Sequence, residues 1–259
     1  QHCNGIDWWL VGHADLQHTY YAWLVTAAGV SGTPVVSNIG AGSIIQTPTW
    51  PGLHVIYYSM KISPGGDRIA KTVVLNTLVN ATNTISVGWQ VSDFDNSTGV
   101  VSNFLQLHPI YQTTSPIPPV TPYGVEFSPD GSKLYGSILE GDVYQWNLCA
   151  GSDSLIRASR YVLTQVNVVK GGLQAAPDGK VYVARHNQTD LGVINSPNLP
   201  GALCNYVDQG LPIGGGICKF GLPNLSPVHV PPPQFTYTMN TCFTGTFTAP
   251  ATSVLNTYV

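Results

Sequence analysis

The chain has little charge. Only 9% of its 259 residues are Asp, Glu, Lys or Arg, the net charge is −3, and Lys and Arg form no cluster. Nucleic-acid-binding proteins need a basic patch to contact phosphates, so the sequence argues against this class. No apolar run approaches the roughly 18 residues that a membrane-spanning helix requires, so we expect no membrane span.

The chain also lacks the common signatures of catalysis and metal binding. Its five cysteines form no Cys-x-x-Cys pair, and there is no Gly-x-Ser-x-Gly, His-Glu-x-x-His or phosphate-binding loop. These patterns would indicate a zinc site, a hydrolase or a nucleotide site. Without them we predict no catalytic residue, no metal and no cofactor, and hence a protein that is not an enzyme.

The sequence does contain three copies of one phrase, at residues 60–70, 125–135 and 173–183. Each copy is a short alternating apolar run, a Pro-Asp-Gly-type turn and a second β-rich run, which is typical of a β-hairpin. The first copy has Gly-Gly-Asp in the turn, so we expect a turn that is altered in type but not lost. Repetition of hairpins at about 40–65 residues indicates a β-propeller.

The repeats predict an all-β chain with negligible helix. Residues 1–229 are predicted as a β-propeller region with about four blades, which are part of a larger ring. Residues 230–233 read Val-Pro-Pro-Pro and form a stiff linker. Residues 234–259 alternate too strictly for a tail and are predicted to open a second β domain.

Four separated motifs occupy residues 3–13, 94–103, 123–135 and 221–224. Together they resemble one family, the secreted propeller-like regions of large surface proteins from Bacteroidota. In that family the propeller is similar to WD-repeat and YVTN-type repeats and is followed by PKD-like, immunoglobulin-type sandwiches. The resemblance implies that residues 234–259 begin such a sandwich. It also implies type IX secretion, an extracellular or outer-membrane-associated location, and roles in adhesion or gliding motility.

The resemblance also implies missing parts. Family members usually have a substantial region before the segment that matches Cys3-Asn-Gly5, and four units cannot close a ring of six or seven blades. An unpaired strand edge invites aggregation unless something covers it. We therefore expect the first blade to pack, through Trp8 and Trp9, on upstream sequence of the same protein or on another chain.

A disulfide is predicted between Cys149 and Cys204. Each of these residues follows the third strand of a repeat unit, and the two units are successive, so the thiols could meet on neighbouring blade edges. Oxidising compartments favour such bonds. The alternative is that both residues are small buried hydrophobes.

Two groups of residues could bind metals, and each has a simpler explanation. The first group contains His2, His13 and His18 with Asp7 or Asp15. It is either a transition-metal site or a set of solvated loop residues. The second group contains Asp93, Asp95, Asn96 and Thr98. Its oxygens could bind Ca²⁺ or form an Asx turn, and we favour the turn.

The aromatic residues suggest binding surfaces as well as core. Strand patterns predict that Trp8, Trp23 and Trp146 are core residues. Trp50 lies between prolines in a loop and is predicted to be exposed, where it could contact a glycan or a protein. The sequence around Ser154, Asp-Ser-Leu, resembles a Bacteroidota O-glycosylation site in the polar loop after Cys149, although an ordinary loop serine would look the same.

Two functions from different classes remain. The first is a non-catalytic cell-surface or secreted module for adhesion, for filament or matrix assembly, or for glycan or protein binding. The second is a propeller enzyme of lactonase type, because YVTN-type propellers resemble lactonases. Such enzymes place acids and histidines around the central channel, and the candidates here are Glu126, Glu140, Asp142 and His186.

Overall fold

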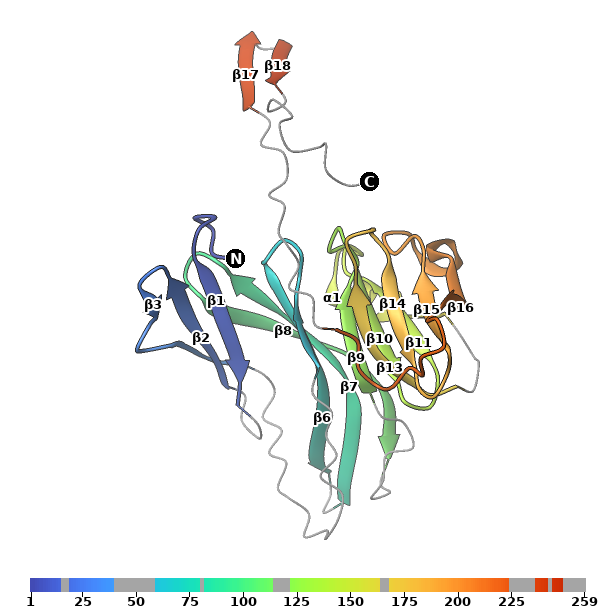
Figure 1. Ribbon diagram of the computed structural model, residues 1–259. Coiled ribbons are helices and arrows are strands. Elements are labelled where there is room, and N and C mark those ends of the chain that lie inside the picture. Colours follow the sequence, from blue (N-terminus) through green and yellow to red (C-terminus); the bar gives the residue numbers. More distant parts are fainter. Residues whose placement is uncertain are drawn as a thin grey trace. The chain divides into compact units, whose positions relative to one another are not determined.

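The structure is a computed structural model, and it divides into two compact units, Gln1–Pro227 and Val228–Val259 (Figure 1). The structure describes residues 1–14, 19–39, 59–79, 82–113, 122–163, 168–223, 236–241 and 244–248. In the second unit it describes one antiparallel hairpin, β17 (Thr236–Thr241) with β18 (Thr244–Thr248). The predicted strands after the proline linker are therefore present, and the PKD-like sandwich stays a prediction.

The described part of the first unit contains four antiparallel sheets, which follow one another along the chain. Sheet 1 contains β1 (Trp8–His13), β2 (Thr19–Thr26), β3 (Gly29–Val30) and β4 (Val35–Asn38). Sheet 2 contains β5 (Met60–Ile62), β6 (Arg68–Val79), β7 (Thr82–Asp95) and β8 (Val100–Thr113). Sheet 3 contains β9 (Pro122–Phe127), β10 (Lys133–Ile138), β11 (Val143–Asn147) and β12 (Tyr161–Val162). Sheet 4 contains β13 (Lys170–Ala175), β14 (Val181–Arg185), β15 (Asp190–Ile194) and β16 (Tyr206–Pro212). The prediction of an all-β chain with four blade-like units is confirmed.

The repeated phrase forms the first hairpin of sheets 2, 3 and 4, namely β5–β6, β9–β10 and β13–β14. Each turn contains a glycine with positive φ, at Gly66 (+70°), Gly131 (+70°) and Gly179 (+78°). Only glycine adopts this conformation without a steric cost. The altered first copy keeps this glycine, which explains why its turn is preserved.

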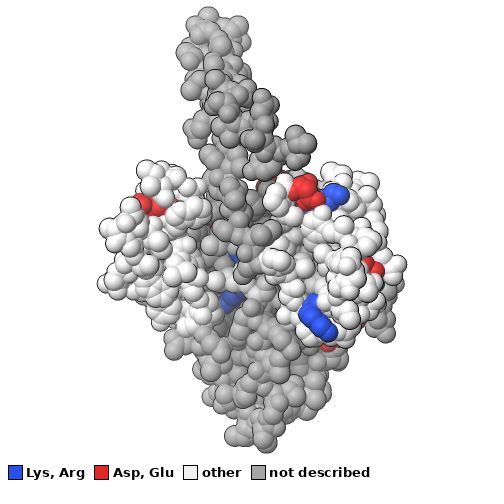
Figure 2. All heavy atoms as spheres, in the orientation of Figure 1, with Lys and Arg blue, Asp and Glu red and all other residues white. Residues whose placement is uncertain are grey.

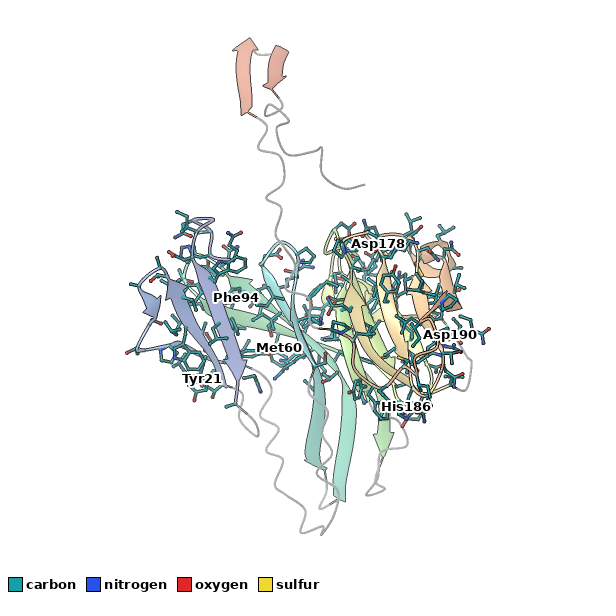
Figure 3. All side chains as sticks on the ribbon, viewed as in Figure 1. Tyr21, Met60, Phe94, Asp178, His186 and Asp190 are labelled. Atoms are coloured by element: carbon teal, nitrogen blue, oxygen red, sulfur yellow. The ribbon has the colours of Figure 1, made fainter. Side chains whose placement is uncertain are left out.

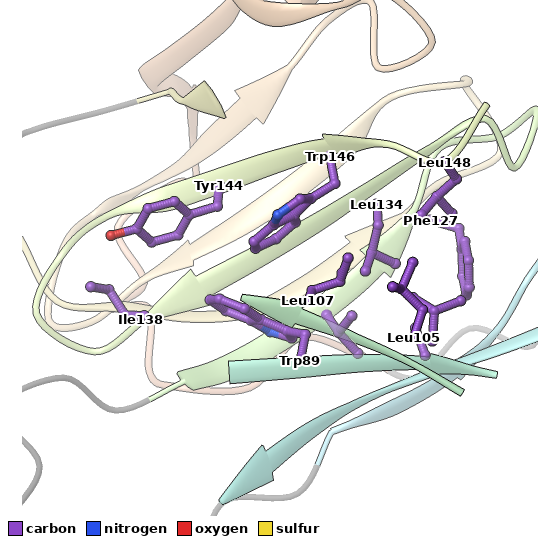
Figure 4. Close-up of a cluster of buried hydrophobic side chains, with 12 residues drawn as sticks. Trp89, Leu105, Leu107, Phe127, Leu134, Ile138, Tyr144, Trp146 and Leu148 are labelled. Carbon is purple, nitrogen blue, oxygen red and sulfur yellow. The ribbon is translucent and has the colours of Figure 1, made fainter. Parts of the chain in front are cut away.

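Apolar side chains fill the contacts between successive sheets. One cluster joins sheets 1 and 2 around Tyr20, Ile69 and Phe94, and another joins sheets 3 and 4 around Tyr135 and Val183. The cluster in Figure 4 joins sheets 2 and 3, and its largest buried members are Trp89 and Trp146. Alternate residues of a strand point to opposite faces, so the middle sheets present an apolar face to each neighbour.

The predicted burial of tryptophans is right for Trp146 and wrong for Trp8. The Trp146 side chain is 0% exposed, whereas Trp8 is 44% exposed. Trp23 is partly buried. Trp9 donates a 2.9 Å hydrogen bond from its indole nitrogen to the Asn96 carbonyl, so this ring is covered by the chain's own β7–β8 turn. The face of sheet 1 that carries Trp8 has no covering sheet among the described residues.

Among the described residues, two short helices interrupt the strands, α1 (Asp153–Ala158) and the 3₁₀ helix η1 (Gly201–Cys204). The Ser152 hydroxyl caps α1 by accepting a bond from the Leu155 amide. Ser154 therefore lies in a helix and not in the predicted polar loop, because a cap serine followed by an acidic residue starts a helix.

Candidate functional site

One position of the repeat brings three polar side chains together. Lys61, Glu126 and Gln174 each stand three residues before the proline of their phrase, on the edge strands β5, β9 and β13. We call these three residues the repeat cluster. Because the three hairpins are equivalent, the same position of each reaches the same region of the molecule.

The repeat cluster is linked by short polar contacts. The Lys61 ammonium nitrogen lies 3.1 Å from Glu126 Oε2 and donates a 2.8 Å hydrogen bond to Gln174 Oε1. The Glu126 carboxylate also accepts bonds from the amides of Phe127 (3.0 Å) and Ala175 (3.1 Å). Both oxygens of Glu126 are therefore engaged, and the contacts tie three sheets together.

The electrostatics of the repeat cluster follow from its burial. The side chains of Lys61 and Glu126 are 17% and 7% exposed. Burial raises the pKa of Glu126, because a charged carboxylate loses its hydration, and the Lys61 charge and the two amides oppose this rise. An ionised Glu126 thus depends on Lys61 for compensation.

Two of the other candidate catalytic residues, Asp142 and His186, contact residues outside the repeat cluster. Asp142 accepts a 3.0 Å hydrogen bond from the Tyr144 hydroxyl, and the His186 ring stacks on Phe220 with ring centres 3.9 Å apart. Within the part of the chain that the structure describes, no hydrogen bond or ion pair connects Glu126 with Asp142 or His186. Burial and the neighbouring acids Asp142 and Glu140 raise the pKa of Tyr144. Among the described residues, Glu126, Asp142 and His186 therefore make their contacts with different partners.

Sheet 4 holds a second charged group that the sequence analysis missed. Lys170 is 2.6 Å from Asp208 Oδ1, and Arg185 is 2.8 Å from Asp208 Oδ2 and also pairs with Asp190. Figure 3 labels Asp190 on sheet 4. The side chains of Lys170 and Arg185 are 0% and 1% exposed. Two cations face two anions, so the group is balanced in charge and ties β13, β14, β15 and β16 together. No spacing in the sequence indicates it, because the partners come from four strands.

The structure gives the histidines of the first predicted metal group separate partners. The His2 ring stacks on Trp9, and its Nδ1 accepts a 3.0 Å bond from the Asn4 amide. His13 Nε2 lies 2.5 Å from the Lys71 ammonium nitrogen. His18 and Asp15 lie outside the described residues.

The second predicted metal group is a turn. Asp95 Oδ1 accepts bonds from the Ser97 hydroxyl (2.6 Å) and the Ser97 amide (2.9 Å), which is an Asx turn. The Ser97 hydroxyl and amide, with Thr98, lower the pKa of Asp95 to about 2. Asp93 accepts a bond from Asn103. Among the described residues, no group of three or more His, Cys, Asp or Glu residues is arranged to hold a metal ion.

The predicted disulfide is wrong. Cys149 and Cys204 are both free, and Cys149 is exposed whereas Cys204 is buried. Cys204 packs in the apolar cluster between sheets 3 and 4, and burial raises the pKa of its thiol. The alternative, a small buried hydrophobe, holds for Cys204.

The two predicted surface sites have different outcomes. Ser154 is exposed on α1, where its hydroxyl lies 3.1 Å from that of Ser152, and the modification stays a prediction. Trp50 lies outside the described residues. On the face that Figure 2 shows, few of the described side chains are charged, as the composition leads one to expect. None of the described helices has the length and apolar character needed to cross a membrane.

Comparison with known proteins gives a likeness of fold alone. No family model matches the chain, and no curated protein matches it. Among solved structures, the C-terminal WD40 domain of Sif2 is 12% identical, with 66% of this chain covering 40% of that chain at a TM-score of 0.31. Virginiamycin B lyase from Staphylococcus aureus is 15% identical (71% covering 50%, TM-score 0.33). Regucalcin from Agrobacterium tumefaciens, a calcium-binding protein, is 14% identical (74% covering 57%, TM-score 0.37).

These likenesses are weak and of mixed kind. The chain spans about half the length of the structures that it matches. TM-scores of 0.31–0.37 carry no argument, so the blade assignment rests on the four sheets and their repeated hairpins. The names include a WD40 domain and a lyase, so the likenesses do not separate binding from catalysis.

Proposed function

We propose that this chain is a non-catalytic module of a secreted or cell-surface β-propeller protein. Its function is then to bind other molecules, in adhesion, in surface-filament or matrix assembly, or in glycan or protein contact. The low charge and the Bacteroidota-like motifs at residues 3–13 and 123–135 support this proposal. The resemblance adds type IX secretion and a PKD-like domain that begins at residue 234.

The contacts of Glu126 carry the proposal. An enzyme acid must be free to exchange a proton with a substrate or to hold a metal. Here the Glu126 carboxylate is 7% exposed and binds Lys61 and the amides of Phe127 and Ala175. Its contacts join sheets, so the residue contributes to the assembly of the fold.

A lactonase-type enzyme is the second candidate, and one observation favours it. Buried acids with raised pKa values beside a lysine occur often in active sites. The pKa of Glu126 is raised by burial, and Lys61 is adjacent.

One experiment separates the two functions. The purified chain is incubated with a series of γ- and δ-lactones, with and without Ca²⁺, Mn²⁺ and Zn²⁺, and its metal content is measured. We expect no turnover and no stoichiometric metal. Turnover that the Glu126→Gln variant loses, while the Lys219→Ala variant keeps it, would overturn the proposal in favour of the enzyme.

The proposed location has its own test. In cells of the native source, an antibody against the folded chain should label intact cells, and protease added outside should remove the label. A label that appears only after cell lysis would contradict a surface location.

A further inference from the structure

Sheet 1 is narrower than its neighbours. β1 pairs with one edge of β2, and β3 and β4 share the other edge. β3 pairs with Val25 and Thr26, whereas β4 pairs with residues 19–22. At any level, therefore, sheet 1 is three strands wide, while the path across sheets 2, 3 and 4 crosses four strands.

The outer edge of this narrow sheet is β1. Among the described residues, β1 pairs only with β2, in an unbroken register of six residue pairs from Trp8 to His13. Its sequence, Trp-Trp-Leu-Val-Gly-His, contains no Lys, Arg, Asp, Glu or Pro. Such an edge presents a row of backbone donors and acceptors that another strand can pair with.

The other edge strands of sheets 2, 3 and 4 are protected, as natural proteins protect their edges. Each is short, charged, interrupted by proline or shifted in register. The features are Lys61 in β5, Pro109 in β8, Pro122 in β9, the two-residue length of β12, Lys170 in β13 and Pro212 in β16. β1 has none of these features, which sets it apart as an edge built for pairing.

The side chains of β1 define what can pair with it. On one face, Trp8 and Leu10 are 44% and 56% exposed, and neighbouring Tyr21 and Trp23 stack at 5.7 Å. On the other face, Trp9 and Val11 pack against the cluster between sheets 1 and 2. A strand placed beside β1 would have apolar neighbours on both faces, so it must itself be apolar on both faces.

We propose that the edge of β1 that has no partner among the described residues binds an extended strand of another polypeptide, uncharged and apolar on both faces. Backbone hydrogen bonds supply the affinity of such strand addition, and the side-chain faces supply its specificity. The width of the sheets favours one added strand over a second copy of this chain. A second copy would join its own narrow sheet and give six strands, whereas one strand gives the four found in sheets 2, 3 and 4.

This inference is independent of whether the repeat cluster is catalytic. It identifies an edge and the kind of partner that fits it, and a lactonase could use the same edge. Evidence against the proposed function would therefore not contradict strand binding at β1. Evidence against strand binding would likewise not contradict the proposed function.

Hydrogen–deuterium exchange of the β1 amides tests the inference. The isolated chain is compared with the same protein purified from its native source. Every second amide of β1 points away from β2. These amides should exchange rapidly in the isolated chain and roughly tenfold or more slowly in the native preparation, because a bound strand protects them.

Three results would overturn the inference. Rapid exchange in the native preparation would mean that nothing pairs with β1. Slow exchange in the isolated chain that depends on its concentration would identify a second copy. Slow exchange that does not depend on concentration would mean that the chain itself fills this edge.

A pair of matched variants, produced in the native source, adds a second readout. Leu10→Lys places an ammonium group on the edge strand, and Val30→Lys changes a residue that is 58% exposed on β3. Leu10→Lys should abolish the protection of β1, and Val30→Lys should keep it. Protection that survives Leu10→Lys contradicts the inference, and Trp8→Lys replaces this variant if it does not fold.

Discussion

The indole nitrogen of Trp89 donates a 2.9 Å hydrogen bond to the carbonyl of Gly124, which joins β7 of sheet 2 to β9 of sheet 3. The Trp89 ring fills the space that a side chain at Gly136 would occupy. Trp89 is fully buried in the cluster of Figure 4. The absence of a side chain at Gly136 therefore leaves room for Trp89 of the neighbouring sheet. This contact stabilises the packing of the two sheets.

Replacing Gly136 by alanine should destabilise the protein. A Cβ there would clash with the indole of Trp89, which is fully buried. We expect a loss of about 2 kcal/mol in the free energy of unfolding, measured by urea denaturation. Gly32→Ala is the control, because a Cβ at Gly32 has no heavy atom within 4 Å. Equal effects of the two variants would refute the close contact.

Removing Lys61 should cost more than removing both partners of its ion pair. Lys61→Ala leaves the Glu126 carboxylate buried without its cation, and we expect a loss of about 3 kcal/mol. The double variant with Glu126→Gln removes the uncompensated charge and should regain most of this loss. Lys219→Ala, at an exposed lysine, serves as the control. Additive effects in the double variant would mean that the pair does not interact.

The contribution of Lys71 to the stability of the protein should rise between pH 8 and 10.5. This lysine is 7% exposed, and burial lowers its pKa from 10.5 to about 8. Between these two pH values the unfolded state binds more protons than the folded state, so stability increases with pH. The whole rise should amount to about 3 kcal/mol.

The variant Lys71→Met should lose this rise and be more stable than the original at pH 7. Urea denaturation at a series of pH values measures both effects. The matched variant Lys219→Met, at an exposed lysine, should retain the rise. An equal pH dependence of stability in Lys71→Met and in the original protein would show that Lys71 does not cause the effect.

Ser154 should be glycosylated in protein from the native source. The residue is exposed at the second position of α1, so a sugar would extend into solvent. Mass spectrometry of the peptide should show the added mass on Ser154 and not on Ser152. The variant Asp153→Ala should lose it if the Asp-Ser-Leu pattern directs the modification. An unmodified peptide would rule out the site.

The hairpins could be predicted from the sequence because their determinants are local. A proline, a turn glycine and alternating side chains lie within a few residues of one another, as at Pro129 and Gly131. The burial of Trp8 could not be predicted in this way. Alternation assigns residues to two faces of a strand, but it does not say which face a neighbouring sheet covers.

The repeat cluster could have been found in the sequence, and the group in sheet 4 could not. Aligning the three phrases on their prolines places Lys61, Glu126 and Gln174 in one column, with a cation, an anion and an amide. Lys170 and Asp208 share no such column, since their contact depends on how β13 and β16 are brought together. The mistaken disulfide has the same origin, because the environments of Cys149 and Cys204 are set by distant packing.

The column of Lys61, Glu126 and Gln174 also bears on how similar hairpins find their correct neighbours during folding. Hairpins of the same design can dock in the wrong order, which is a known hazard of repeat proteins. A hairpin docked in the wrong order would separate Glu126 from Lys61 and leave a buried carboxylate without a cation. The three different residues thus favour the native order of the three hairpins over other orders of docking.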